Sequence, residues 1–315
     1  MKIFKFPNMK LYRSLKKIKS IKNSVVSIGM FDGVHLGHMS VINKVIDLAS
    51  KNNLKSIIIT FSNSPTSYFS TDKSDLQITN TKEKIDLFKS TELDYLFVIE
   101  FNEYIANLNP ATFVNDILIS FFNVNHIVFG YDNHFGKNRE GTFEFINKNF
   151  KGIKAELIVA SKENKQTISS TRIKEEILAG SIPSANKLLG RNYNLTGKVV
   201  KGLQLGRKLG FPTANLNCSN QCKLIPKNGV YYTKTIVKKK EYSSVTNIGT
   251  KPSVQNSNIV SIETHILDFE QSIYDQSLSI KFIDRIRNEI KFNHIDDLIE
   301  QITKDIIWVR KLDSL

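Results

Sequence analysis

The sequence is poor in cysteine, with only Cys218 and Cys222 among its 315 residues. Their spacing matches no common zinc-binding pattern, and no second pair exists to complete four ligands, so we expect reduced thiols and no zinc site. No apolar run approaches the ~20 residues that a membrane-spanning helix requires. Residues 1–24 are basic but lack the continuous apolar core of a secretory signal. These absences predict a soluble, cytoplasmic protein with no membrane partner.

Acidic residues are few relative to basic ones. The chain has 30 Asp and Glu against 44 Lys and Arg, which gives a formal net charge of +14. Such a charge can indicate binding to nucleic acid or to a membrane surface. The lysines are scattered, however, and the main clusters are residues 10–22 and residues 238–240. Residues 238–240 look like a hairpin tip. We therefore expect anionic small-molecule substrates and no nucleic-acid partner.

The composition is otherwise that of a globular protein, with 41% hydrophobic and 23% charged residues, and the length favours two domains. In the first half, apolar strand-like runs alternate with helix-like patterns, which is the order of a doubly wound parallel sheet. The runs are residues 24–28, 55–61, 95–101, 126–130 and 155–160. Residues 62–77 are polar and predict a loop. Asn80 and Asn109 look like helix N-caps.

After Leu188 the rhythm changes to short alternating runs separated by turn residues, which favours an antiparallel barrel or sandwich. The runs are residues 193–200, 230–237, 242–248, 259–267 and 278–282. A final helix, capped at Asn293, carries an apolar stripe that we expect to pack against this sheet. The stripe comprises Ile295, Leu298, Ile299, Ile302 and Ile306. We place the domain boundary near residues 184–190, with domains 1–185 and 186–315.

Residues 28–38, IGMFDGVHLGH, join the first apolar run to a helix-like pattern. Glycines at Gly29, Gly33 and Gly37 allow positive φ and the close approach of a ligand. The helix that follows directs its N–H groups and positive dipole end at that ligand, which suits phosphate. His35 and His38 flank the phosphate position as donors. The stretch predicts a nucleotide site, though not a P-loop, since no Gly-Lys-Ser/Thr follows.

A second hydroxyl-rich stretch, residues 167–173, follows the fifth apolar run and enters a helix. Ser169, Ser170 and Thr171 are good helix-capping residues, and taken alone that is the simpler interpretation. Arg172 adds a bidentate phosphate donor at the helix start. Together with a histidine pair in a doubly wound fold, the stretch favours a second phosphate clamp.

The second half has a glycine-rich motif of its own, residues 202–215, GLQLGRKLGFPTAN. Glycines at Gly202, Gly206 and Gly210 make a loop that can fold round phosphates, and Arg207 and Lys208 supply positive charge. The motif therefore predicts a further phosphate site.

Polar side chains at alternating positions accompany this loop. Thr213 and Asn215, two apart on an extended segment, point to the same side and offer neutral oxygens that suit Mg²⁺ or a phosphate. Glu263 and His265 share a face of a later strand by the same period. A carboxylate there can act as a general base, although a solvated strand residue is the simpler interpretation of Glu263 by itself.

These motifs together resemble the bacterial bifunctional riboflavin kinase/FAD synthetase family over nearly the whole chain. The matching stretches are residues 29–38, 130–136, 168–172, 206–215, 247–249 and 263–269. The resemblance implies an α/β plus all-β protein. A Rossmann-like nucleotidyltransferase domain is followed by an antiparallel β-barrel riboflavin kinase domain with a C-terminal helix.

The resemblance also implies two successive ATP-dependent steps. Riboflavin is phosphorylated to FMN, and FMN is then adenylylated to FAD with release of pyrophosphate. In the kinase half, Glu263 takes the proton of the ribityl 5′-hydroxyl while Thr213 and Asn215 hold Mg²⁺ and ATP phosphates. The implied loop residues are Gly206, Arg207 and Gly210.

In the adenylylating half, the resemblance implies that His35 and His38 stabilise charge on the ATP phosphates. Ser170, Thr171 and Arg172 grip the departing pyrophosphate. The other cofactor-binding residues that it implies are Gly29, Phe31, Asp32, Gly33 and Gly37.

The chain departs from the family pattern at a few positions. Residues 61–65 read FSNSP where the family usually has Phe-x-Pro-His-Pro, and Asn133 and His134 replace the usual phenylalanine and arginine. In the kinase half, Lys251 and Ser253 replace arginine and threonine. Because the first two departures fall in the adenylylating half, the alternative is a working riboflavin kinase with weak or lost FMN adenylyltransferase activity.

Two rivals come from other classes. One is a nucleotidyltransferase with another acceptor, such as a pantetheine or nicotinamide phosphate, but that leaves the kinase-like half unexplained. The other is a basic, non-enzymatic protein that binds RNA or flavin, which the combination of Glu263, Thr213 and Asn215 disfavours.

Overall fold

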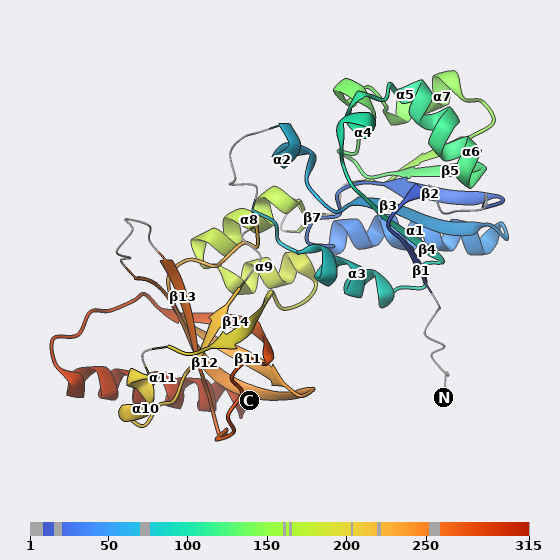
Figure 1. Cartoon of the computed structure of the whole chain (residues 1–315). Coiled ribbons are helices and arrows are strands. Elements are labelled where there is room, and N and C mark those ends of the chain that lie inside the picture. The colour runs from blue at the N-terminus through green and yellow to red at the C-terminus, as the bar shows by residue number, and fades with distance from the viewer. Residues whose placement is uncertain are drawn as a thin grey trace. The chain divides into compact units, whose positions relative to one another are not determined.

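The computed structural model describes residues 9–15, 21–69, 76–159, 162–163, 166–202, 204–218, 222–251 and 259–314. The chain forms two compact units, Met1–Ser170 and Thr171–Leu315 (Figure 1). No helix in the described ranges is long and apolar enough to cross a membrane.

The first unit is built on a parallel sheet of six strands in the order β1-β4-β3-β2-β5-β6. The strands are β1 (Lys10–Tyr12), β2 (Ser24–Ile28), β3 (Lys55–Phe61), β4 (Tyr95–Ile99), β5 (Val124–Phe129) and β6 (Lys154–Leu157). Every residue of β2 is buried, as is usual when helices cover both faces of a parallel sheet. The doubly wound sheet is confirmed. The first two predicted runs match β2 and β3 at both ends, and the ends of the other three differ by up to three residues. Ala160, at the predicted end of the fifth run, lies outside the described residues.

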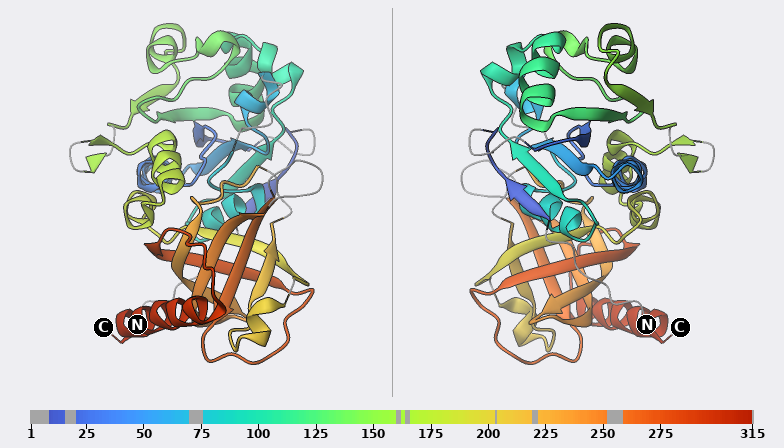
Figure 2. Two further views of the ribbon diagram at one scale, coloured as in Figure 1. Left: turned by 90° about the vertical axis from the view of Figure 1, so that its left-hand side faces the viewer. Right: turned by 90° about the vertical axis from the view of Figure 1, so that its right-hand side faces the viewer.

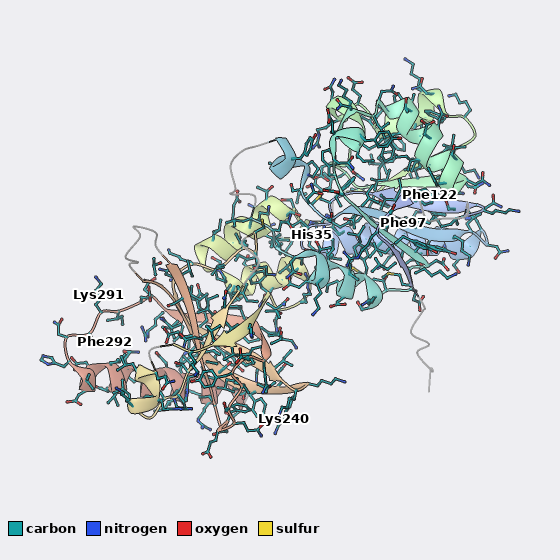
Figure 3. The ribbon with its side chains drawn as sticks, viewed as in Figure 1. His35, Phe97, Phe122, Lys240, Lys291 and Phe292 are labelled. Atoms are coloured by element: carbon teal, nitrogen blue, oxygen red, sulfur yellow. The ribbon has the colours of Figure 1, made fainter. Side chains whose placement is uncertain are left out.

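Helices cover both faces of this sheet (Figure 2). They are α1 (Leu36–Lys51), α2 (Pro65–Phe69), α3 (Thr81–Lys89), α4 (Glu103–Asn107), α5 (Pro110–Thr112), η2 (Phe113–Ile119), α6 (Ser120–Phe122), η3 (Lys137–Arg139) and α7 (Phe143–Asn149). Helices α1 and α3 pack on one face, and α4 to α7 pack on the other. In that second core the rings of Phe97 and Phe122 meet edge to face, with centroids 4.8 Å apart (Figure 3). A short hairpin, β7 (Lys162–Glu163) and β8 (Gln166–Thr167), completes the unit.

Local sequence signals explain most helix starts. Asn80 and Glu83 form a reciprocal capping box at α3, and Asn109 caps α5 with Pro110 in its first turn, so both predicted caps are confirmed. The prediction of a loop over residues 62–77 is wrong where α2 forms. Proline is preorganised for the first turn of a helix, and the Ser64 hydroxyl accepts a hydrogen bond from the Thr66 N–H at 3.1 Å.

The second unit is a closed antiparallel barrel with strand order β10-β13-β12-β11-β14-β9. Its strands are β9 (Asn194–Val200), β10 (Ala214–Asn217), β11 (Gly229–Val237), β12 (Lys240–Lys251), β13 (Ile259–Ile266) and β14 (Ser277–Arg287). Its helices are α8 (Ser170–Ala179), which begins at the last residue of the first unit, α9 (Ile182–Leu189), α10 (Leu205–Lys208) and α11 (Ile295–Asp313). The barrel, rather than a sandwich, is confirmed. Residues 214–217 supply the strand that the five predicted runs lacked.

The predicted lysine-rich hairpin tip is also confirmed. Val237 pairs with Lys240, so Lys238 and Lys239 form a two-residue turn between β11 and β12. Both have positive φ, 48° and 71°. Two consecutive positive φ values match the right-handed twist of the flanking strands.

Five hydroxyl side chains line up inside the barrel, each with 0% of its surface exposed. They are Thr233, Thr235, Ser244, Thr246 and Thr264, from β11, β12 and β13. Successive oxygens along this row lie 2.7 to 2.8 Å apart. Because each hydroxyl both donates and accepts, the row satisfies polar groups that burial would otherwise leave costly.

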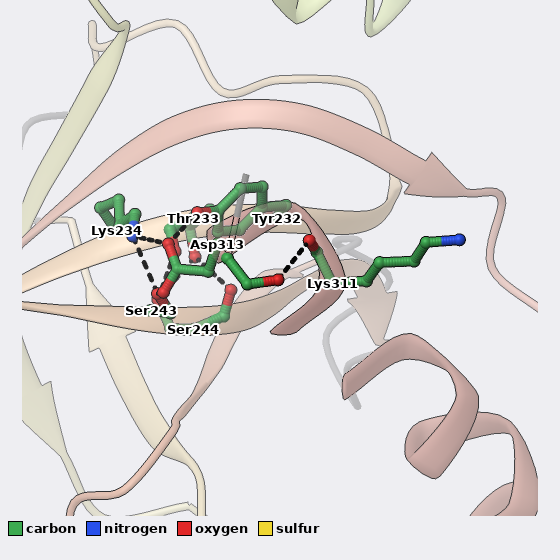
Figure 4. Close-up of polar contacts among 8 residues, drawn as sticks. Tyr232, Thr233, Lys234, Ser243, Ser244, Lys311 and Asp313 are labelled. Carbon is green, nitrogen blue, oxygen red and sulfur yellow. Dashed lines mark hydrogen bonds and ion pairs between the residues drawn. The ribbon is translucent and has the colours of Figure 1, made fainter. Parts of the chain in front are cut away.

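Helix α11 is held against the barrel by two polar anchors. Arg287 of β14 forms a bidentate pair with Asp305, which is 3% exposed, and its Nη2 lies 2.8 Å from Oδ2. At the helix end, Asp313 accepts hydrogen bonds from Tyr232 at 2.8 Å and from Lys234 and Ser243 (Figure 4). The bonds from Lys234 and Ser243 lower the pKa of Asp313 to about 2.

The predicted start and stripe of α11 need correction. The N-cap residue is His294 rather than Asn293, and it makes no side-chain cap bond. Ile306 does pack against the barrel, but Ile295 is 59% exposed, and the buried positions are Asp305 and Val309. The helix therefore turns a mixed face to the barrel, because Arg287 supplies a partner for one carboxylate.

Asp305→Ala is expected to destabilise the second unit by about 3 kcal/mol, since it leaves the Arg287 guanidinium without its buried partner. Trp308, the single tryptophan of the chain, lies on α11 and contacts the Tyr232 ring. Its fluorescence during urea unfolding measures this loss. Lys304→Ala, which removes the exposed Glu300–Lys304 pair of the same helix, is the control and should leave the midpoint unchanged. Equal midpoints for the two variants would contradict the anchoring role.

Candidate functional site

A cavity of about 760 Å³ opens at the carboxyl ends of β2 and β5 in the first unit. The chain runs from β2 outward to β3 and β4 on one side and to β5 and β6 on the other, so this is where the strand order reverses. Ligands of open parallel sheets bind at such a point. The lining includes Gly29, Met30, Phe31, Asp32, His38, Gly130, Asn133, His134 and Ser170. The fold therefore brings all three predicted motifs of this half to one cavity.

The turn after β2 is strained. Phe31 and Val34 have φ of 49° and 38°, a region that L-residues with side chains disfavour, and Gly33 has φ of 82°. A Cβ on Gly33 would lie 3.1 Å from Cδ1 of Ile78. Glycine is therefore required at residue 33 for both its backbone conformation and the space beside it.

Asp32 holds this turn to a neighbouring loop. Its carboxylate accepts hydrogen bonds from the backbone N–H of Ile78 at 3.2 Å and of Thr79 at 3.0 Å, and the side chain is buried. Gly33 N–H donates to the Thr79 hydroxyl at 2.9 Å, and Ser170 donates to the Asp32 carbonyl at 2.9 Å. Asp32 thus contributes to the shape of the cavity as well as to its lining.

The two histidines differ in position. His35 is the N-cap of α1 and is 4% exposed, and its Nδ1 accepts the His38 N–H at 3.3 Å. The rings stack with centroids 3.6 Å apart, and His38 lines the cavity. A neutral imidazole that accepts at Nδ1 carries its proton on Nε2, so His35 is a donor there. Gly37 packs beside this pair, because a Cβ on it would lie 3.2 Å from the His35 ring.

Ser170 is the first residue of α8 and lines the cavity of the first unit. Thr171 and Arg172 are the next residues of that helix and fall within the second unit. Thr171 is exposed and Arg172 is half-buried. The three residues follow one another on the first turn of α8, as the hydroxyl-rich stretch predicts.

The residues that depart from the family pattern have structural partners here. The Asn63 side-chain amide donates to the Phe101 carbonyl and accepts its N–H, both at 2.8 Å, which ties the ends of β3 and β4 together. Ser64 caps α2. Asn133 donates to the Ile28 carbonyl, and His134 lines the cavity. Ser253 lies outside the described residues.

The sequence interpretation missed the apolar part of the cavity. Its residues come from the ends of β3 and β4, from α4, from η2 and from the segment after β5. They are Phe61, Phe101, Ile105, Phe113 and Phe135. In the sequence, aromatic residues lie at or just beyond the ends of predicted strands, and this pattern could have indicated an apolar wall. That these residues line one cavity is seen only in the structure. Such a wall suits a flat aromatic ring beside the polar turn.

In the barrel, strand register assembles the second set of predicted residues. Glu263 of β13 lies directly opposite Asn215 of β10 and Asn247 of β12. Directly opposite residues share a face of the sheet, so these three side chains form a row. Thr213 precedes Asn215 by two residues. A Cβ on Gly202 would contact the Asn215 amide, so glycine leaves room for that side chain.

The glycine-rich loop is fastened to the same strand. Nδ1 of His265 lies 2.8 Å from the Pro212 carbonyl, and its ring meets Phe211 edge to face at 5.8 Å. Phe211 N–H donates to the Gly206 carbonyl at 2.8 Å. Gly210 has φ of 88°, and Arg207 is exposed on α10. The loop thus leads into the strand that lies opposite Glu263, and Gly206 and Gly210 stand where its backbone turns.

The candidate metal donors in this half are side-chain oxygens. Within the described ranges, no group of three or more His, Cys, Asp or Glu side chains is placed to hold a metal ion. Asn215 carries an amide oxygen and lies opposite the Glu263 carboxylate, and Thr213 has a hydroxyl two residues earlier. Oxygen groups of these types are the ones that Mg²⁺ prefers.

Comparison with known proteins gives matches over both halves. The FAD synthetase family model matches residues 17–172, and the riboflavin kinase family model matches residues 189–312. A Buchnera aphidicola protein is 36% identical over 98% of this chain and 100% of its own length. A Bacillus subtilis protein is 38% identical over 90% of each chain. Both are named bifunctional riboflavin kinase/FMN adenylyltransferase.

A solved structure extends the comparison to three dimensions. A Streptococcus pneumoniae crystal structure, described as a macrolide-efflux protein, has a TM-score of 0.89 and 30% sequence identity. It covers 96% of this chain and 98% of its own. The combination of a parallel-sheet unit and a barrel unit in one chain is therefore shared with a solved protein.

Gly33→Ala is expected to destabilise the first unit by about 1–2 kcal/mol, because alanine is strained at φ of 82° and would crowd Ile78. It should also weaken nucleotide binding at the cavity. Far-UV circular dichroism during urea unfolding and calorimetric titration with an ATP analogue measure the two effects. Gly152→Ala is the matched control, since a Cβ there has no neighbour within 4 Å. Unchanged stability and binding in Gly33→Ala would refute the requirement for glycine.

Proposed function

The chain belongs to the bifunctional riboflavin kinase/FMN adenylyltransferase family, and we propose how its residues divide the two reactions. It is a transferase that phosphorylates riboflavin with ATP to FMN and adenylylates FMN with a second ATP to FAD. The main observation in support of this function is that each half of the chain matches one of the two family models. A kinase without adenylylation is not favoured, because the full-length relatives are named for both activities.

We propose that residues 1–185 form the FAD synthetase domain and residues 186–315 the riboflavin kinase domain. The two family matches leave residues 173–188 between them, which supports a boundary in this region. The end of α8 and most of α9 occupy that interval. A cytoplasmic location is also a proposal, supported by the low cysteine content and by the use of ATP in both steps.

For adenylylation, an FMN phosphate oxygen attacks the α-phosphorus of ATP, the bond from that phosphorus to the bridging oxygen breaks, and pyrophosphate leaves. We assign phosphate binding to the turn at residues 29–37 and to the N–H groups that begin α1. His38, on the cavity wall, and His35, through Nε2–H, stabilise the developing charge. Ser170, Thr171 and Arg172 bind the departing pyrophosphate.

For phosphorylation, the ribityl 5′-hydroxyl attacks the γ-phosphorus of ATP and ADP leaves. We assign the proton-accepting role to Glu263, which lies in the row with Asn215 and Asn247. Thr213 and Asn215 would hold Mg²⁺, which neutralises phosphate charge when bound. Gly206, Arg207 and Gly210 form the loop that surrounds the ATP phosphates.

Incubation of the purified protein with riboflavin, ATP and Mg²⁺, followed by chromatographic separation of the flavins, should give FMN first and then FAD. The order follows because FMN is the product of one half and the substrate of the other. Pyrophosphate release should track FAD. Accumulation of FMN with no FAD would remove the adenylylation half of the function.

Glu263→Gln is expected to lower the rate of FMN formation by about 10²–10⁴-fold, the usual contribution of a general base. FAD formation from supplied FMN should stay at the parent rate. His38→Asn should lower FAD formation and leave FMN formation at the parent rate. Each variant therefore controls for the folding of the other. A Glu263→Gln protein that phosphorylates riboflavin at the parent rate would exclude Glu263 from the proposed role.

A further inference from the structure

One charged side chain of the first unit is buried directly beneath the strained turn. Lys84 of α3 is 2% exposed. Its Nζ donates to the carbonyl of Met30 at 2.7 Å, to the carbonyl of Phe61 at 3.2 Å and to the Thr60 hydroxyl at 3.5 Å. A buried ammonium is costly unless each of its three N–H groups finds an acceptor. Here three acceptors surround it.

These acceptors belong to the segments that build the cavity. Met30 lies in the turn after β2, and Phe61 ends β3, and both line the cavity. The Met30 carbonyl also accepts the Thr60 hydroxyl at 2.9 Å. Lys84 therefore joins the carboxyl ends of two neighbouring central strands at the edge of the cavity.

The same segment of chain holds the turn a second time. Ile78 and Thr79, just before α3, donate to the Asp32 carboxylate. Lys84 follows within the first turn of that helix, whose start the Asn80 capping box sets. The turn is thus held on both sides of Phe31, whose positive φ costs energy that surrounding contacts must offset.

We propose that Lys84 is a positioning residue for FMN adenylylation, whose ammonium holds Met30 and Phe61 so that the turn meets the ATP phosphates in a fixed geometry. Lys84 acts through these two residues rather than on the reacting atoms. The inference rests on the proposed role of residues 29–38 as the ATP site. It predicts that adenylylation needs the protonated form of Lys84.

Burial lowers the pKa of Lys84 to about 8, and the nearby Asp32 carboxylate opposes that shift. Asp32 is the charged group that the turn presents to Lys84. Strand β3 presents the Thr60 hydroxyl and the Phe61 carbonyl, and Glu83 of the same helix is bound in the capping box. As pH rises through about 8, the ammonium becomes an amine with two donors instead of three. The hold on the turn then weakens.

The test compares Lys84→Met with Lys82→Met, an exposed lysine of the same helix. Adenylylation of supplied FMN and phosphorylation of riboflavin are measured on each full-length protein. Lys84→Met should lower kcat/KM for ATP in adenylylation by about tenfold or more, because small misplacements of a substrate cost rate steeply. KM for FMN should change by less than about twofold. The kinase activity, and both activities of Lys82→Met, should match the parent.

The pH profile separates positioning from a general loss of stability. In the parent, adenylylation relative to kinase activity should fall as pH rises through about 8, and in Lys84→Met this fall should disappear. A ratio that stays flat in the parent from about pH 7 to 9.5 would overturn the inference, even if Lys84→Met does not fold. So would equal adenylylation by the two variants. A parent that makes no FAD from FMN would refute the proposed function instead.

Discussion

The first unit depends on a turn whose backbone is unfavourable for its own residues. Phe31 and Val34 both have positive φ, although neither is glycine. Such residues keep this conformation only where neighbouring contacts offset the cost. Several of those contacts come from one distant segment, through Ile78 and Thr79 to Asp32 and through Lys84 to Met30. The position of the His35–His38 pair, which begins the next helix, follows from how this turn is held.

In the barrel unit, the candidate site residues are positioned by strand register and not by a strained turn. Pairing of β13 with β10 and β12 sets Glu263 opposite Asn215 and Asn247. A slip of one residue would turn Glu263 into the interior and expose the buried Thr264. The hydroxyl row inside the barrel opposes such a slip, because Thr264 of β13 contacts a specific partner, Thr246 of β12, at 2.8 Å. Buried hydroxyl groups on the inner face of the barrel thus help to fix the register of the neighbouring residues on the other face.

Two residues that depart from the family pattern, Asn63 and Ser64, have clear structural roles beside the cavity. From the sequence, Asn63 and Ser64 stand where the family has proline and histidine. In the structure Asn63 joins the ends of β3 and β4, and Ser64 caps the helix whose Pro65 and Thr66 line the cavity. Both residues support the wall of the cavity. Periodicity could not reveal this, because each partner lies in a loop or beyond a strand end.

The sequence by itself determined the two-part architecture, the two activities and the helix caps at Asn80 and Asn109. Alternating apolar runs, glycine spacing and capping residues act over a few neighbours, so they can be recognised along the chain. Only the tertiary structure decided that Asp32 pairs with the loop before α3, that Lys84 is buried beneath the turn, and that apolar residues from separate elements meet in the cavity wall. It also decided that residues 214–217 complete the barrel. The physical reason is that these contacts join segments tens of residues apart, which local patterns do not encode.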